Sequence, residues 1–156
     1  MLLLFENLLV AALLVAVTFT LHFAGLVGLM AMLRRLGGHP RRSSTVVKQG
    51  IAILTVVFGL FALHSLQIWI YAFAYLGVGE LQQLETALYF STVSFTTVGF
   101  GDVILSDDWR MLGAAEGANG FLLIGWSTAF LVSLTARVRA FEAEIEGIDD
   151  QAPGGP

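Results

Sequence analysis

Seven consecutive residues, Thr96 to Asp102 (TTVGFGD), have the types and spacing that could hold a cation with main-chain oxygen atoms. Gly99 and Gly101 alternate with larger residues, and glycine adopts positive φ without the penalty that a Cβ brings. A backbone of alternating handedness can point successive carbonyl oxygens at one axis, and the Thr97 hydroxyl can add a further oxygen. Such oxygens can replace the hydration shell of an ion. The stretch therefore predicts an oxygen-lined ion path.

The composition indicates an integral membrane protein. Of the 156 residues, 56% are apolar and only 13% are charged, whereas a soluble domain carries about 25% charge. The chain has no cysteine, which excludes a disulfide scaffold, thiolate metal sites and cysteine nucleophiles. The net charge of −4 does not indicate a nucleic acid partner.

Three long segments are apolar enough to cross a bilayer, which takes about 20 residues of helix. They are residues 7–33, 49–78 and 111–136, and only the last contains a charged residue, Glu116. We therefore predict an all-α membrane protein with three transmembrane helices per chain. Its expected parts are an N-terminal peripheral transmembrane helix in 1–36, a basic cytoplasmic loop in 37–48, a pore domain in 49–138 (outer helix 49–78, inner helix about 110–138) and a short cytoplasmic tail in 139–156.

The basic residues predict the orientation. Two groups flank the helices: Arg34, Arg35, Arg41, Arg42 and Lys48 between the first and second, and Arg137 and Arg139 after the third. The positive-inside rule places both groups in the cytoplasm. A multi-pass plasma-membrane protein with its N-terminus outside and its C-terminus in the cytoplasm follows. Residues 79–110 must then leave the membrane and return on the outer side.

Within that stretch, residues from about 84 to 96 are too few to cross the bilayer and suit a re-entrant pore helix. Glu80 and Glu85 lie near its start, where acidic groups complement the helix dipole. We expect Trp69, Tyr71 and Tyr75 to form an aromatic belt at the outer end of the second helix.

The segment Ala87 to Asp102, ALYFSTVSFTTVGFGD, resembles the pore of the tetrameric potassium channel family. The family filter reads TVGYG, and Phe100 stands here at the tyrosine position. The resemblance implies a K+ filter in 97–101, formed by Thr97, Val98, Gly99, Phe100 and Gly101, with K+ on the carbonyls of the first four. It also implies that Thr96 supports the filter and that Asp102 lies at the outer mouth.

The chain departs from that family at three places. Phe100 has no hydroxyl, Val93 stands where some members have a buried glutamate, and residues 104–110 lack the proline often found there. One chain has one pore loop, so a fourfold pore needs three identical subunits beside it, arranged by cyclic symmetry. We expect this homotetramer to lie in the lipid bilayer, with K+ as the permeant ion and no other cofactor. No constellation of catalytic residues suggests an enzyme.

The inner helix has candidate gating and cavity positions. The resemblance places Gly120 near the hinge of the family's inner helix, with Gly125 a second candidate, and close packing is the alternative role for both. Residues at helical spacing below them are expected to line an inner cavity: Phe121, Ile124, Thr128, Leu131 and Thr135. The alternative for this stripe is packing or lipid contact.

Ionisable residues inside membrane helices are functional candidates. We expect His22 and His64 to be neutral and to bond between the first two helices, since their depths in the membrane allow it. Two imidazoles alone are too few ligands for a metal site. Ser127 and Asn119 should bond to neighbouring helices. Glu116 points about 100° away from the cavity stripe. The hydroxyls at its depth belong to Ser91, Thr92, Ser94 and Tyr71.

Two roles remain open for Glu116: a protonated packing residue, or a brace behind the filter in place of the glutamate absent at Val93. For the whole protein, the sequence favours a potassium-selective ion channel. A non-selective cation channel is the alternative if Phe100 or Val93 loosens the filter. A non-conducting regulatory subunit is a further alternative, against which the intact TTVGFGD argues.

Overall fold

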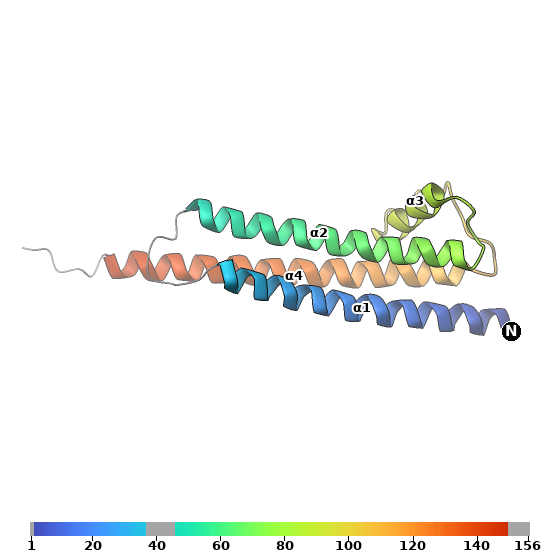
Figure 1. Ribbon diagram of the computed structural model, residues 1–156, viewed down its shortest axis with the longest axis horizontal. Coiled ribbons are helices and arrows are strands. Elements are labelled where there is room, and N and C mark those ends of the chain that lie inside the picture. Colours follow the sequence, from blue (N-terminus) through green and yellow to red (C-terminus); the bar gives the residue numbers. More distant parts are fainter. Residues whose placement is uncertain (1, 37–45, 150–156) are drawn as a thin grey trace, which may run out of the picture.

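The computed structural model describes the backbone of residues 2–36 and 46–149 and the side chains of residues 3–35 and 50–136. Most of the predicted basic loop, 37–48, and the end of the predicted tail, 150–156, lie outside these residues. Every regular element in the described ranges is a helix: α1 (Leu2–Leu36), α2 (Val46–Gly77), α3 (Leu84–Phe95) and α4 (Arg110–Asp149). Three are long rods, and the short α3 lies at the end of the molecule where α1 begins (Figure 1).

The three rods are long and apolar enough to cross a membrane. The candidate spans are Leu3–Arg35, Gly50–Gly77 and Arg110–Ala136. The predicted all-α class with three candidate spans is therefore confirmed. The last helix continues to Asp149, beyond the predicted end of the pore domain at 138.

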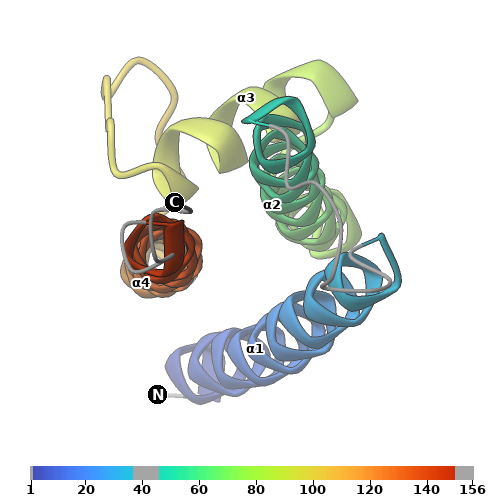
Figure 2. The same cartoon turned by 90° about the vertical axis from the view of Figure 1, so that its left-hand side faces the viewer.

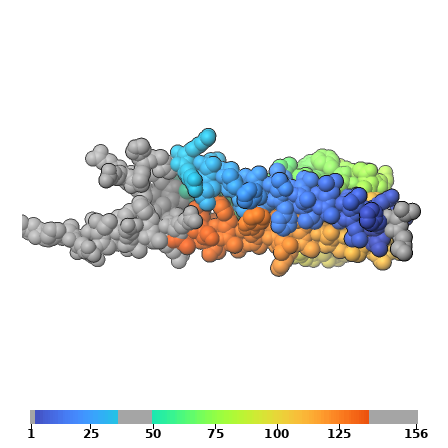
Figure 3. All heavy atoms as spheres, turned by 90° about the horizontal axis from the view of Figure 1, so that it is seen from below, coloured from blue at the N-terminus to red at the C-terminus, as the bar shows by residue number. Residues whose placement is uncertain are grey.

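Seen along the rods, α1 and α3 lie on opposite sides of the pair formed by α2 and α4 (Figure 2). Each of the two packs against both members of that pair. From the sequence we expected α1 to be a peripheral helix, and in the structure it packs on α2 and also runs along α4 (Figure 3). Consequently α1 contacts both long helices of the predicted pore domain.

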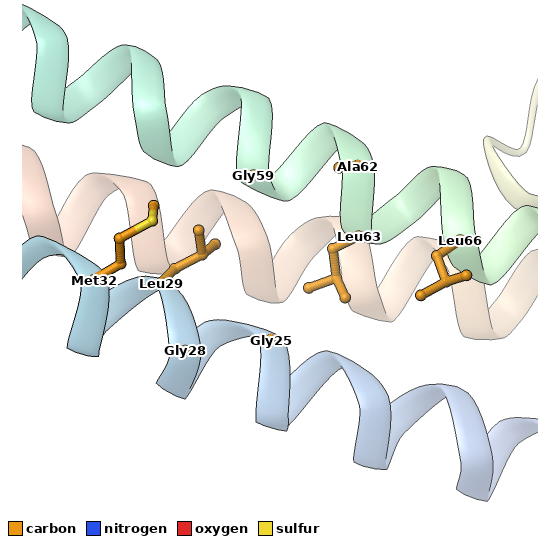
Figure 4. A pocket seen from close by; sticks show the side chains of 8 residues that line it. All are labelled: Gly25, Gly28, Leu29, Met32, Gly59, Ala62, Leu63 and Leu66. Carbon is orange, nitrogen blue, oxygen red and sulfur yellow. The ribbon is translucent and has the colours of Figure 1, made fainter.

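Glycines allow α1 and α2 to approach closely. A Cβ at Gly25 would lie 2.6 Å from Leu63 Cδ2, and one at Gly59 would overlap the Leu29 side chain. Each helix thus places a leucine over a glycine of the other, beside an open apolar groove of about 360 Å³ (Figure 4). Because lipid provides no hydrophobic force between helices, such close packing is what holds them together.

At the end near α3, Tyr71 and Tyr75 pack with Ala11 and Leu112 in a buried cluster. Both tyrosines are fully buried, whereas Trp69 is 40% exposed. The predicted aromatic belt is therefore wrong for the two tyrosines. They turn inward because their hydroxyls have hydrogen-bonding partners on α4, namely Asn119 and Glu116.

One face of α3, formed by Ala87, Ser91 and Phe95, is buried at four-residue spacing. Its last turn sits directly on Gly120 of α4, where a Cβ would overlap the Phe95 carbonyl group and lie 2.9 Å from Phe95 Cα. A Cβ at Gly125 would meet nothing within 4 Å. Close packing therefore requires glycine at position 120 but not at 125. The hinge role of either glycine stays a prediction.

We predict that Gly120→Ala destabilises the protein and that Gly125→Ala stabilises it. Both changes raise helix propensity by about 1 kcal/mol, but only the first forces backbone apart, at a cost of about 1–3 kcal/mol. Thermal unfolding of the purified variants measures the difference. Equal stability of the two variants would show that the contact with Phe95 does not constrain position 120.

Candidate functional site

Residues 97–101, the segment that follows α3, alternate between positive and other φ values, as the sequence suggested. Thr97, Gly99 and Gly101 have φ of 61°, 57° and 76°, and Val98 and Phe100 between them are not in the positive-φ region. Thr97 is the one non-glycine residue with positive φ in the described part of the chain. Positive φ is strained for a β-branched residue, and such strain clusters at functional sites.

Hydrogen bonds tie the amides of this segment to the end of α3. The N–H groups of Val98 and Gly99 both donate to the Val93 carbonyl, at 3.0 and 3.3 Å, and that of Thr97 donates to the Ser94 carbonyl at 2.9 Å. Thr96, which we expected to support this segment, caps the C-terminal end of α3 and donates its hydroxyl to the Thr92 carbonyl. The N–H groups of residues 97–99 are therefore hydrogen-bonded inside the chain.

The carbonyl oxygens of residues 97–100 have no such partners. No hydrogen bond among the described residues ends on any of these four oxygens. The side chains are equally uncovered, since Val98 is 54% exposed and Phe100 70% exposed. The segment therefore presents free carbonyl oxygens and bare apolar side chains, which a single chain does not cover.

Beyond the segment, the Tyr89 hydroxyl of α3 donates to the Asp102 carboxylate at 2.7 Å. This hydrogen bond holds the pKa of Asp102 below its usual value and raises that of Tyr89. It joins the far end of the segment to α3. Our sequence reasoning missed Tyr89, although it is the only tyrosine in the predicted pore helix, residues 84–96.

A second link closes the connection between α3 and α4. The carboxylate of Glu80 accepts the N–H of Ser106 and, at 2.9 Å, its hydroxyl. From the sequence we expected Glu80 to complement the dipole of the pore helix, yet only Glu85 lies in the first turn of α3. The acid at position 80 instead connects the turn before α3 to the loop after Asp102.

Glu116 lies behind α3, fully buried. It accepts a hydrogen bond from the Tyr75 hydroxyl at 2.6 Å, and its other oxygen lies 2.5 Å from Ser91 Oγ. Of the four partners that its depth suggested, Ser91 makes the contact. Tyr71 does not, because its hydroxyl instead accepts from Asn119. We missed Tyr75 because we had placed it in the aromatic belt.

Counting protons gives the state of this carboxyl group. Ser91 Oγ also donates to the Ile68 carbonyl at 2.9 Å, and a hydroxyl has one proton to donate. A carbonyl oxygen only accepts, so the short contact with Glu116 needs a proton from the carboxyl. All three hydrogen bonds are therefore satisfied together only when Glu116 is protonated. In that form it joins α2, α3 and α4.

The predicted cavity residues lie on α4 at different degrees of exposure. Phe121 and Thr128 are exposed, and Ile124 and Thr135 are half-buried. Leu131 is also half-buried and packs on the cluster of Leu26, Val56 and Leu60 between α1 and α2. Its side chain is thus shared with the contact to the other helices. A cavity lining by this stripe stays a prediction.

We predict that Tyr89→Phe raises the pKa of Asp102, because it removes the hydrogen bond that stabilises the ionised carboxylate. A group with a lowered folded pKa stabilises the fold above its unfolded pKa and loses that effect as the pH falls through the folded value. The acid-side loss should therefore move to higher pH in the variant. Carbon NMR of the Asp102 carboxyl measures the shift, and Tyr75→Phe is the matched control that should leave it unchanged.

We predict that Glu116→Gln keeps near-native stability at neutral pH, since an amide can accept from Tyr75 and donate to Ser91. Glu116→Leu should lose about 1–3 kcal/mol, because it leaves a buried hydroxyl without a partner. In alkaline solution the wild type should weaken, because ionising the carboxyl breaks the set of three bonds, and Glu116→Gln should not. Chemical unfolding across pH tests this. Equal alkaline weakening of the two proteins would contradict a protonated Glu116.

Comparison with known proteins agrees with this geometry. A family model described as "Ion channel" matches residues 50–137, which include most of α2, all of α3, the 96–102 segment and the candidate membrane span of α4. No curated protein matches the chain. No solved structure matches it either. The match covers more than half of the 156 residues, so this chain belongs to the ion channel family.

Proposed function

We propose that the protein is a potassium-selective channel, in which four copies of the chain place residues 97–101 around one axis. The observation that carries the proposal is the alternation of positive φ at Thr97, Gly99 and Gly101, with the carbonyl oxygens of 97–100 left without partners. Rings of such oxygens replace the hydration shell of K+. One chain supplies a quarter of each ring.

The exposed apolar surface supports assembly. Val98, Phe100, Phe121 and Val132 are all more than half exposed in the single chain. Lipid can cover the membrane part of this surface, but Val98 and Phe100 flank the free carbonyls, which lipid cannot satisfy. Irregular backbone at membrane depth is tolerated only inside protein or along a watery path. Three identical subunits around the axis would cover the apolar side chains and would enclose the free carbonyl oxygens in a watery ion path.

The orientation follows from the same proposal. In Figure 1 the N-terminus lies at the same end as α3 and the 96–102 segment. With the basic residues in the cytoplasm, this end faces outward, as expected for a plasma-membrane channel with its C-terminus inside. Glu80, Asp102, Asp107 and Asp108 then surround the outer mouth, where acidic groups concentrate cations.

Ion flux into liposomes tests the proposal. We expect a K+ gradient to drive flux that Ba²⁺ blocks and that Na⁺ does not support. Gly99→Ala should abolish the flux, because alanine is strained at φ of 57°. Gly79→Ala is the matched control: Gly79 has φ of 76° in the turn after α2, and there too a Cβ would meet nothing within 4 Å.

Two results would contradict the proposal in different ways, and the two glycine variants test where the ion path lies. Equal flux of Na⁺ and K+ would indicate the non-selective cation channel. Absence of flux from a protein that forms tetramers would indicate the regulatory subunit. Loss of flux in both glycine variants would show only that strained backbone is harmful, and loss in Gly99→Ala alone locates the ion path at residues 97–101.

A further inference from the structure

Four polar side chains from three helices meet near the middle of the candidate spans. They are His22 of α1, His64 and Gln67 of α2, and Ser127 of α4. His22 and Gln67 are fully buried, and Ser127 is 5% exposed. The two imidazoles bridge helices as expected, but they do so through the other two side chains. Their rings stack, with centroids 5.4 Å apart.

The contacts form a closed circuit, which we call the histidine ring. His64 Nδ1 lies 3.0 Å from Gln67 Oε1, and Gln67 Nε2 lies 3.2 Å from His22 Nδ1. His22 Nε2 lies 3.4 Å from Ser127 Oγ, which lies 2.9 Å from His64 Nε2. Each imidazole therefore uses both of its nitrogens, and the circuit returns to its start.

The carbonyl of Thr18 sets the direction of the ring. Gln67 Nε2 also lies 3.3 Å from this oxygen, which can only accept, so the amide nitrogen must face it. Gln67 then accepts from His64 Nδ1–H and donates to His22 Nδ1. A neutral His22 carries its proton on Nε2 and donates to Ser127. The Ser127 hydroxyl donates to His64 Nε2, which closes the ring.

Every bond of the ring is thus satisfied once, with both imidazoles neutral. His64 is the Nδ1–H tautomer and His22 the Nε2–H tautomer, and the opposite orientation of Gln67 would lose the bond to Thr18. An extra proton on His22 Nδ1 would face the Gln67 amide N–H, donor against donor. An extra proton on His64 Nε2 would turn the Ser127 hydroxyl away, and Ser127 Oγ would then accept from both imidazoles. Protonation of His22 therefore opens the ring, whereas protonation of His64 reverses the direction of its bond with Ser127.

The described surroundings present no charged group that would stabilise a positive charge there, and the aromatic ring on His22 is that of Trp126, with centroids 5.4 Å apart. Among the described residues packed near the ring, α1 and α3 present no further titratable group, and α2 presents Tyr71, whose hydroxyl accepts from Asn119. On α4 the nearest is Glu116, eleven residues from Ser127 or about 16 Å along the helix, and it is occupied by Tyr75 and Ser91. A charge at this depth is costly.

The ring also touches the end of α3. The His64 ring lies 5.7 Å from that of Phe95, the last residue of α3, and residues 96–101 follow at once. We propose that the histidine ring is an acid-sensitive contact between helices: its neutral form holds α1 on α2 and α4 and supports Phe95, and protonation of His22 opens it and lowers conduction. The part of this proposal that concerns conduction rests on the proposed function.

Imidazole nitrogen NMR tests the ring without any ion flux. In a His39→Gln background only the two ring histidines contribute signals. We expect one tautomer for each at neutral pH, Nδ1–H for His64 and Nε2–H for His22, and loss of both patterns on acidification. A His64 that carries its proton on Nε2, or a mixture of tautomers at both residues, would overturn the ring.

Flux measurements at equal pH on both sides of the liposome test the coupling. We expect wild type to keep its K+ flux at neutral pH and to lose it several-fold on acidification below about pH 6, because a positive charge at this depth is costly. Ser127→Ala opens the ring at every pH, so its flux should be low and independent of pH. Ser133→Ala is the matched control, because that exposed hydroxyl donates to the Ala129 carbonyl of its own helix.

The outcomes separate the two proposals. A Ser127→Ala protein with the pH profile of wild type would overturn the coupling, even if the channel conducts K+. Absence of flux from all three proteins would overturn the proposed function and the coupling together, and the tautomers would then decide the ring by themselves. K+ flux that is independent of pH in Ser127→Ala but falls with acid in Ser133→Ala would support the acid-sensitive role of the histidine ring.

Discussion

The buried carboxyl of Glu116 is the contact on which the arrangement of the helices around α3 depends. From α4 it contacts Tyr75 of α2 and Ser91 of α3, and the Ser91 hydroxyl donates a hydrogen bond to the Ile68 carbonyl. Lipid offers no partner for any of these groups, so separating the helices would leave several polar atoms without hydrogen bonds. A helix of twelve residues, too short to be stable by itself, is held in position by this contact.

The conformation of residues 97–101 follows from how α3 ends. Phe95 rests on Gly120 without space for a Cβ, and the carbonyl of Val93 receives the N–H groups of Val98 and Gly99. At the far end, Tyr89 holds Asp102. The N–H groups of residues 97–99 are hydrogen-bonded at one end and the Asp102 carboxylate is held at the other. The segment between them keeps a strained positive φ at Thr97 and leaves its carbonyl oxygens free. The strain is maintained by α3, not by the segment itself.

Polar contacts join α1 to the rest of the chain at three levels. The Asn7 amide donates to the Asp108 carbonyl at 2.5 Å, the Asn119 amide donates to Thr18 at 2.8 Å, and the histidine ring includes His22. Beyond His22, the glycines Gly25 and Gly59 let α1 and α2 approach closely. Apolar surface alone would not distinguish a neighbouring helix from lipid tails. These polar groups therefore specify the position of a helix that lies outside the region matched by the family model.

The sequence by itself determined the all-α class, the three candidate spans and the glycine-bearing segment, because these follow from length, hydropathy and the φ that glycine permits. It also placed Glu116 at the depth of Ser91, since helical rise and angle are regular. It could not show that Tyr71 and Tyr75 turn inward, that Tyr89 reaches Asp102, that Glu80 bonds to Ser106 or that four side chains close a ring around two histidines. Those contacts join residues far apart along the chain, and which of several hydroxyls at one depth finds a partner depends on how the helices are rotated and packed. Only the tertiary structure decides that rotation.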